Sequence, residues 1–230
     1  VFLFIDEFTN YNESELGVKT FLLLTHLGYE VLVPKHLESG RTFITKGLLR
    51  NAKKIANENI ILLKDVINPA TPLIGIEVSA ILSFRDEYLD LVDTNLKSAA
   101  EKIAESTFTL EEFLSLEIKK GKISSASFTN NFKKIKLHGH CQQKAIASTN
   151  ATVEVLSLPQ NYKVEEIPSG CCGMAGAFGY EKEHYDLSMK VGELVLFPAI
   201  REEHSDTIIC APGTSCRHQI KDGTERSAFH

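Results

Sequence analysis

The sequence of 230 residues has no apolar run long enough to cross a membrane and no surplus of basic residues. Its longest apolar runs, near residues 21–24 and 195–197, fall far short of the ~20 residues that span a bilayer. The formal net charge is -5 at pH 7, so no basic field attracts nucleic acid or anionic lipid. With 43% hydrophobic residues, the chain can still bury a substantial core. We expect a soluble globular chain that binds no nucleic acid and has no transmembrane segment.

The first 140 residues contain no cysteine, and all five cysteines lie beyond them. An odd, one-sided set does not resemble the evenly paired framework of a small secreted domain. The chain also starts on the apolar residues 1–5, without an initiator methionine or the charged start of a signal peptide. We therefore expect a piece of a longer polypeptide from a reducing, cytoplasmic compartment, with its cysteines used for metal or redox chemistry.

An internal duplication appears at a near-constant offset of about 133 residues. Gly28-Tyr29-Glu30-Val31 aligns with Asn161-Tyr162-Lys163-Val164, and a later match aligns Ser79-Ala80 with Ser215-Cys216. In this alignment four cysteines of the second half fall opposite residues that cannot replace a thiol: Cys141 opposite Phe8, Cys171 opposite Glu38, Cys172 opposite Ser39, and Cys216 opposite Ala80. The first half is therefore predicted to lack the site of the second.

Each half has the pattern strand, helix, strand, helix, strand. The expected strands are 1–6, 30–34, 73–78, 134–138, 153–156 and 206–210, and the expected helices are 13–27, 42–59, 141–150 and 179–197. Alternating strands and helices predict an α/β fold of two pseudo-symmetric repeats, each a small parallel sheet flanked by helices.

The stretch between the repeats is rich in charge and has apolar residues at helical spacing. We interpret it as a helical insertion of two or three helices. The predicted domains are a first repeat at 1–85, an insertion and linker at 86–133, and a second repeat at 134–230.

Four cysteines stand beside glycines in three predicted loops. Cys141 follows a strand, Cys171-Cys172 precedes Gly173, and Cys216 follows the last strand. Because the carboxyl ends of parallel strands share one sheet edge, these loops are expected to converge. Glycine lets a turn aim both adjacent thiols at one metal or cluster, and the backbone amides after Gly173 suit the charge of thiolate sulfur. The remaining cysteine, Cys210, lies inside an apolar strand and is expected to fill the core.

Polar neighbours of these cysteines are candidates to orient the ligands or to hydrogen-bond to them. The set consists of His138, His140, Gly173, Arg217 and His218. Solvated or capping roles, and direct ligation by a histidine, remain open from the residues alone.

The pattern Cys141, Cys171-Cys172-Gly173 and Cys216, together with Pro168-Ser169-Gly170, resembles the cysteine-rich CCG domain. That domain occurs in the heterodisulfide reductases, in glycolate oxidase iron–sulfur subunits, and in FAD-linked oxidases of the D-lactate and D-2-hydroxyglutarate dehydrogenase type. The continuation Met174 to Glu183 is most similar to the last group. The family carries two such domains in tandem, so the resemblance covers nearly the whole chain.

The resemblance implies an iron–sulfur electron-transfer module of a larger flavin-dependent 2-hydroxy-acid dehydrogenase. Cys141, Cys171, Cys172 and Cys216 would hold the cluster, which is expected to be [4Fe–4S]. Flavin and ferredoxin-like domains of the same polypeptide, with FAD outside this chain, would deliver electrons, and a quinone or carrier protein would accept them. A quinone would imply a peripheral position at the inner membrane face.

The sequence departs from the family pattern at Gly213, where the fuller motif Cys-x-x-Cys has its first cysteine. Four cysteine ligands remain instead of five. Two other chemistries stay open: a structural zinc site built from the same four thiolates, and a thiol redox catalyst using Cys171 or Cys172. A binding module with vestigial cysteines is a further alternative.

Overall fold

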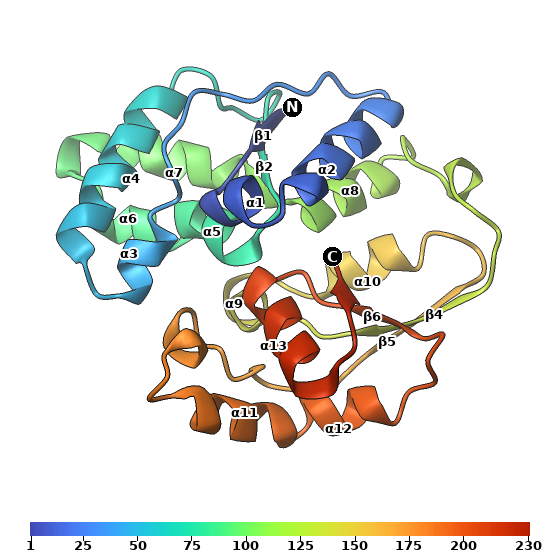
Figure 1. Ribbon diagram of the computed structural model, residues 1–230. Helices are drawn as coiled ribbons and strands as arrows, with labels where there is room; N and C mark the ends of the chain where they lie inside the picture. Colours follow the sequence, from blue (N-terminus) through green and yellow to red (C-terminus); the bar gives the residue numbers. More distant parts are fainter. The chain divides into compact units, whose positions relative to one another are not determined.

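Two short parallel sheets form the framework of the chain, one in each half (Figure 1). The computed structural model describes residues 1–230, which divide into two compact units, Val1–Phe113 and Leu114–His230. Each unit is a layered α/β structure with its own core. The predicted α/β class and the two helix-flanked parallel sheets are confirmed.

The first sheet has the strand order β1-β2-β3, with all pairs parallel. Its strands are β1 (Phe2–Phe4), β2 (Leu73–Gly75) and β3 (Thr107–Thr109). Leu32 adds a parallel bridge to Phe2 on the outer side of β1. The central residues Leu3 and Ile74 are fully buried, as expected for parallel strands covered on both faces.

The helices of the first unit follow from apolar spacing and local turn chemistry. They are α1 (Glu7–Tyr11), α2 (Ser14–His26), α3 (Arg41–Thr45), α4 (Leu49–Leu63), α5 (Val78–Leu82), α6 (Glu87–Leu91), α7 (Lys97–Glu105) and the start of α8 (Leu110–Lys119). In α4, Ala52, Ala56 and Ile60 lie on one buried face. Asp6 caps α1 by accepting hydrogen bonds from the amides of Phe8 and Thr9, both at 2.9 Å.

The second sheet has the order β5-β4-β6-β7, again all parallel. Its strands are β4 (Lys133–Leu137), β5 (Tyr162–Glu166), β6 (Ile208–Cys210) and β7 (Ala228–Phe229). The accompanying helices are α9 (Cys141–Ile146), α10 (Asn150–Leu156), α11 (Tyr185–Glu193), α12 (Leu196–Arg201) and α13 (Thr214–Thr224).

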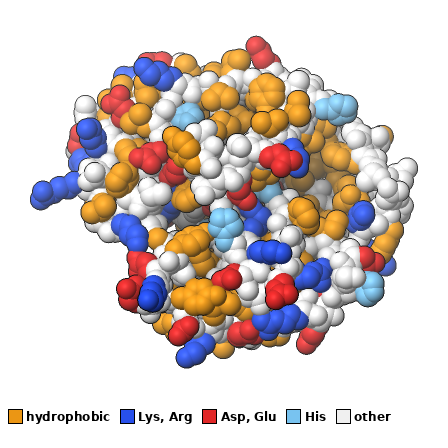
Figure 2. Space-filling model, viewed as in Figure 1, with side chains coloured by type: hydrophobic (Ala, Val, Ile, Leu, Met, Phe, Trp, Pro, Cys, Tyr) orange, Lys and Arg blue, Asp and Glu red, His pale blue; other side chains and the backbone are white.

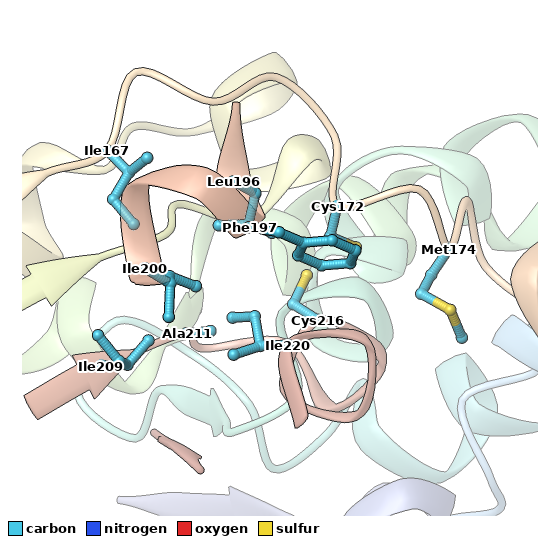
Figure 3. Close-up of a cluster of buried hydrophobic side chains, with 10 residues drawn as sticks. All are labelled: Ile167, Cys172, Met174, Leu196, Phe197, Ile200, Ile209, Ala211, Cys216 and Ile220. Carbon is cyan, nitrogen blue, oxygen red and sulfur yellow. The ribbon is translucent and has the colours of Figure 1, made fainter. Parts of the chain in front are cut away.

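The second sheet separates two apolar clusters. Val153 and Leu156 of α10 pack with Ile135, Leu137 and Cys210. The other cluster, drawn in Figure 3, contains Ile167, Cys172, Met174, Leu196, Phe197, Ile200, Ile209, Ala211, Cys216 and Ile220. Alternation along β6 sends the Ile209 side chain into this cluster and the Cys210 side chain into the first.

The two units repeat the same order of elements. In both, the first strand of the unit is followed by a short helix, and a later parallel strand leads to a second helix. Ala80 is the third residue of α5 and Cys216 is the third residue of α13, so the two residues occupy the same place in their helices. At the first site the match shifts by one: Glu7, not Phe8, begins its helix as Cys141 does. The turn between β4 and α9 is one residue longer than the turn between β1 and α1.

Several predicted boundaries were wrong. Residues 153–156 belong to helix α10, and the strand of that region is β5 instead. The apolar run at 153–156 was too short to distinguish the 3.6-residue period of a helix from the two-residue period of a strand. The expected helix 42–59 is broken into α3 and α4 at Gly47, whose φ is 70°, and 179–197 holds a 3-10 turn, α11 and the start of α12. Residues 30–34 contribute one bridge and not a full strand.

The expected insertion at 86–133 contains α6, α7 and α8, but it also contains β3, which pairs with β2. Alternating Thr107, Phe108 and Thr109 favour an extended strand, and this signal lay inside an otherwise helical stretch. The first compact unit consequently extends to Phe113.

None of the helices is both long and apolar enough to traverse a lipid bilayer. Figure 2 shows acidic and basic side chains interspersed over the visible face.

Candidate metal centre

Four cysteines lie at the carboxyl edge of the second sheet. Cys141 is the first residue of α9, which follows β4, and Cys216 lies in the first turn of α13, which follows β6. Cys171 and Cys172 lie in the loop after β5. Because β4, β5 and β6 are parallel neighbours, their three following loops meet at one edge. The structure therefore brings together all four predicted ligands.

The four thiols form a continuous chain of contacts. Hydrogen bonds join Cys141 to Cys171, Cys171 to Cys172, and Cys172 to Cys216. Figure 3 shows the side chains of Cys172 and Cys216 pointing toward each other beside Phe197. None of the thiols forms a disulfide. Burial increases along the chain of thiols, from the exposed Cys141 to the buried Cys172 and Cys216.

These contacts divide the thiols into proton donors and acceptors. The hydrogen bond to Cys171 raises the pKa of Cys141, and the contacts with Cys171 and Cys216 raise the pKa of Cys172. The pKa of Cys171 is lowered because Cys141 and Cys172 donate to its sulfur. The pKa of Cys216 is lowered by hydrogen bonds from Cys172 and from His138, and by the charges of the His140 and His138 imidazoles. Sulfurs held in thiolate form are good metal ligands.

Backbone amides surround the sulfurs of the Cys171-Cys172 pair. The amide of Gly173 donates to Cys171 Sγ at 3.3 Å, and the amide of Ala175 donates to the same sulfur. The amide of Met174 interacts with Cys172. Such a ring of N–H groups stabilises negative charge on sulfur. This agrees with the prediction for the amides after Gly173.

Gly173 has a φ of 104°, a region that favours glycine. A Cβ at this position would collide with the carbonyl oxygen of Ser188 and lie 3.0 Å from Gln219 Nε2. Gln219 Nε2 in turn donates to Ser188 Oγ at 2.8 Å. Sequence reasoning had not found Ser188 and Gln219, which have no pattern that points to the site, but they fix the loop that carries the cysteine pair.

His138 lies fully buried directly after β4, with its ring beside the thiols. Its Nδ1 lies 2.7 Å from Ser169 Oγ, whereas its Nε2 is buried and has no hydrogen-bond partner. A ligand atom of His138, Cys172 Sγ and Cys216 Sγ all lie within 4.8 Å of one another. Ser169 is a site residue that the sequence indicated only through its Pro168-Ser169-Gly170 motif.

His140 is also buried, but its ring is used differently. It caps α9, because its Nδ1 accepts a hydrogen bond from the amide of Gln142 at 3.2 Å. A Cβ built on Gly213 would touch the His140 ring, 3.0 Å from its Nε2, and would lie 3.3 Å from Cys216 Sγ. The imidazole of His140 thus fills the space beside Cys216 that a side chain at position 213 would need.

The other two predicted neighbours have partners outside the set of thiols. Arg217 is buried and donates to the carbonyl of Ala211 at 2.7 Å and to Thr214 Oγ1 at 3.1 Å, so it holds the loop between β6 and α13. His218 is exposed on α13, with its Nδ1 at 2.7 Å from the hydroxyl of Tyr180. On a helix, residues two apart point in nearly opposite directions, so the side chains of Cys216 and His218 diverge.

Cys210 is buried on the opposite side of the second sheet, in the cluster with Ile135 and Leu137. Its position in the core follows the expectation for a residue inside an apolar strand.

The corresponding edge of the first sheet is closed by protein hydrogen bonds. The carboxylate of Glu7, which matches Cys141, accepts bonds from Ser39 N and Ser39 Oγ, both at 2.7 Å. Ser39 matches Cys172. The residue after Ser39, Gly40, has a φ of 74°, and the residue after Cys172, Gly173, likewise has a positive φ of 104°. Arg41 then forms a bidentate pair with Glu87 at 2.6 and 2.7 Å. In the first unit, the hydrogen-bonded oxygens of Glu7 and Ser39 therefore stand at the positions that match Cys141 and Cys172 of the second unit.

The donor set of the second unit fits a soft metal or an iron–sulfur cluster. Four thiols converge on one edge, backbone amides surround them, and one imidazole nitrogen beside them has no partner in the protein. Thiolate and imidazole ligands suit zinc and iron–sulfur centres, whereas calcium and magnesium prefer oxygen.

Comparisons with known proteins show that the chain is similar to parts of dehydrogenases. No family model matches the chain, and no solved structure matches it. It is 24% identical over 217 residues to D-2-hydroxyglutarate dehydrogenase of Escherichia coli (strain K12), a match that covers 94% of this chain and 20% of the relative. It is 27% identical over 229 residues to one subunit of the anaerobic glycerol-3-phosphate dehydrogenase of the same strain, covering 97% of this chain and 55% of that subunit.

A similar match, 26% over 231 residues, is found with D-2-hydroxyglutarate dehydrogenase of Haemophilus influenzae, covering 96% of this chain and 21% of the relative. The chain thus spans about a fifth of the D-2-hydroxyglutarate dehydrogenases and about half of the glycerol-3-phosphate dehydrogenase subunit. Over nearly its whole length the chain is a relative of a segment of these dehydrogenases, and the predicted resemblance to the CCG-domain region of the FAD-linked oxidases is confirmed.

Proposed function

We propose that this chain is the iron–sulfur electron-transfer module of a larger flavin-dependent 2-hydroxy-acid dehydrogenase. The observation that carries the proposal is the convergence of Cys141, Cys171, Cys172 and Cys216 at one sheet edge. These four residues would hold a cluster, which we propose to be [4Fe–4S]. The similarity to dehydrogenases supports the redox assignment.

An iron–sulfur cluster supplies one-electron storage and transfer when it is bound. The protein's own contribution would be to position the ligands and to set the charge around them. Amides of Gly173, Met174 and Ala175 face the sulfurs and would favour the more reduced, more negative state. Cys141, which is exposed, would place one side of the centre near solvent and near a redox partner.

We further propose that the partners are flavin and ferredoxin-like domains of the same polypeptide, with FAD outside this chain. The acceptor would be a quinone or a carrier protein, and the location would be cytoplasmic or peripheral at the inner membrane face. The short coverage of the relatives is consistent with a segment of a longer enzyme.

The test is anaerobic rapid mixing of the full-length protein with a 2-hydroxy acid, followed by visible absorption. The wild-type protein should show flavin bleaching and then cluster bleaching. Cys172→Ser should keep the flavin phase, lose this cluster's share of the later bleaching, and lose reduction of a downstream acceptor dye. A variant that reduces the acceptor at the wild-type rate would contradict an electron-transfer role, and Cys210→Ser is the matched control that should behave like the wild type.

A structural zinc site is the second candidate, and one distance favours it. His138, Cys172 and Cys216 present ligand atoms within 4.8 Å of one another, a spacing close to that of ligands on a single metal ion. Zinc bound by these residues would be colourless and would leave flavin kinetics unchanged. Iron and acid-labile sulfide would be absent from this site.

A further inference from the structure

His138 presents a buried ring nitrogen on the side of the thiols. Its Nδ1 lies 2.7 Å from Ser169 Oγ, and that hydroxyl lies 3.5 Å from the carbonyl oxygen of Ile167. Nε2 is buried and forms no hydrogen bond of regular geometry, and the ring interacts with the Cys216 sulfur, whose pKa it lowers. A metal ion could take the place of the proton on this nitrogen, because a neutral imidazole binds metal through either ring nitrogen.

The ring of His138 lies beside two of the thiols. The ligand atoms of His138, Cys172 and Cys216 fall within 4.8 Å of one another, and all three residues are buried. Tetrahedral ligands on one metal ion, at metal–sulfur and metal–nitrogen distances of ~2.3 and ~2.1 Å, are separated by ~3.6–3.8 Å. A contraction of up to about 1 Å would therefore let all three bind one ion.

His140 provides a comparison within the same turn. Its Nδ1 accepts the amide proton of Gln142, so the proton of the neutral ring is on Nε2, which faces the Cys216 side. His140 can donate a hydrogen bond there but has no free lone pair for a metal.

We propose that Nε2 of His138 is a direct ligand of the metal centre, sharing one metal ion with Cys172 and Cys216, and that Ser169 orients the ring. The inference rests on the proposed metal centre but not on its identity. It adds a nitrogen ligand to a site in which Gly213 leaves the family's cysteine motif one thiol short. Metal-bound histidine commonly donates its other N–H to a protein oxygen, as His138 does to Ser169.

The experiment is X-ray absorption spectroscopy at the edge of the bound metal, on full-length protein purified anaerobically. We expect one imidazole among sulfur ligands in the wild type. His138→Ala should lose the imidazole contribution, and His140→Asn, which retains a capping acceptor, should keep it. Where the centre is paramagnetic, pulsed EPR should show nitrogen coupling that disappears in His138→Ala and persists in His140→Asn.

Ser169→Ala supplies a second variant that leaves both histidines in place. Loss of an orienting partner typically weakens metal binding 10–100-fold, so a chelator should remove the metal at least about tenfold faster than from the wild type. The same variant should retain the imidazole signal in the loaded state. Release at the wild-type rate would contradict the role of Ser169.

The outcomes separate this inference from the proposed function. Iron with imidazole coordination supports both, and iron with only sulfur ligands overturns the inference while leaving electron transfer intact. Zinc with imidazole coordination supports the inference and overturns the proposed function. Protein that binds neither metal under anaerobic conditions overturns both.

Discussion

At the scale of single residues, four thiols of different burial share one site while a fifth is kept apart by the pleat of a strand. Ile209 and Cys210 are adjacent in β6, yet they point to opposite faces of the sheet. The sequence predicted this separation, because glycines flank the four cysteines and apolar residues flank Cys210. The free nitrogen of His138 was not predictable, since it depends on the packing of Ser169 against the ring.

Substitutions at the cysteines should separate ligands from core. Replacing Cys141, Cys171, Cys172 or Cys216 with Ser should each reduce cluster retention, because a hydroxyl is a poor substitute for a soft thiolate. Cys210→Ser should keep the cluster and cost ~1–3 kcal/mol in the free energy of unfolding. Iron per chain and urea unfolding measure the two effects. A loss of iron specific to Cys210→Ser would show that the ligands have been assigned incorrectly.

Asp6 gives the first unit a pH-dependent stability. Its burial, and then the nearby charge of Glu77, raise its pKa from 3.8 to about 6. The folded state therefore holds a proton that the unfolded state releases between these values, so the stabilisation contributed by Asp6 is fully present below pH ~4 and is lost as pH rises through ~6. The difference corresponds to about 3 kcal/mol.

Asp6→Asn should remove this dependence, because Asn caps helices as well as Asp does and carries no charge. Urea unfolding of variant and wild type at pH 4 and pH 7 measures it. From pH 4 to pH 7, the free energy of unfolding of the variant should rise by ~2–3 kcal/mol relative to that of the wild type, because only the wild type loses the contribution of protonated Asp6. A constant difference would mean that Asp6 titrates normally.

At the scale of elements, the site depends on three loops that follow neighbouring parallel strands. The apolar runs near β4 and β6 were sufficient to predict two of these strands, whereas β5, which leads to the cysteine pair, was placed too early in the sequence. Residues 153–156 were misassigned because Val153 and Val155 fit a strand as well as one turn of helix. The match of Cys141 to Glu7 was missed because a turn that differs by one residue leaves no mark in an alignment.

The loop of the cysteine pair has little space for change. Gly173→Ala should destabilise the second unit by at least ~2 kcal/mol and reduce iron content, since its Cβ would collide with the Ser188 carbonyl at a φ of 104°. Gly121→Ala is the matched control, because Gly121 also has a positive φ, 72°, but nothing within 4 Å. It should cost only ~1 kcal/mol and leave iron content unchanged. Equal effects of the two substitutions would show that backbone strain alone is responsible.

At the scale of the whole molecule, two related units have diverged at the same sheet edge. The repeat was visible in the sequence because matching residues kept a near-constant offset. The extent of the first unit was not, because β3 is short and lies among helices. Glu7, Ser39 and Arg41 close the first edge with hydrogen bonds, whereas the second edge keeps thiols.

Exposure of the centre should make it sensitive to oxygen. Cys141 is exposed, so we expect aerobic purification to yield protein with little iron, whereas anaerobic protein keeps it. Visible absorption followed for hours after air is admitted measures the loss. A fully loaded aerobic preparation that is stable for days would contradict an accessible centre.

The most direct test of the iron–sulfur assignment is the iron, acid-labile sulfide and zinc content of the full-length protein purified without oxygen. A matched preparation of Cys172→Ser shows how much of each is bound at this site. We predict that iron and sulfide are present in the wild type in comparable amounts and that both fall in the variant by the content of one cluster. Zinc without sulfide, or equal iron and sulfide in both proteins, would contradict an iron–sulfur cluster held by these cysteines.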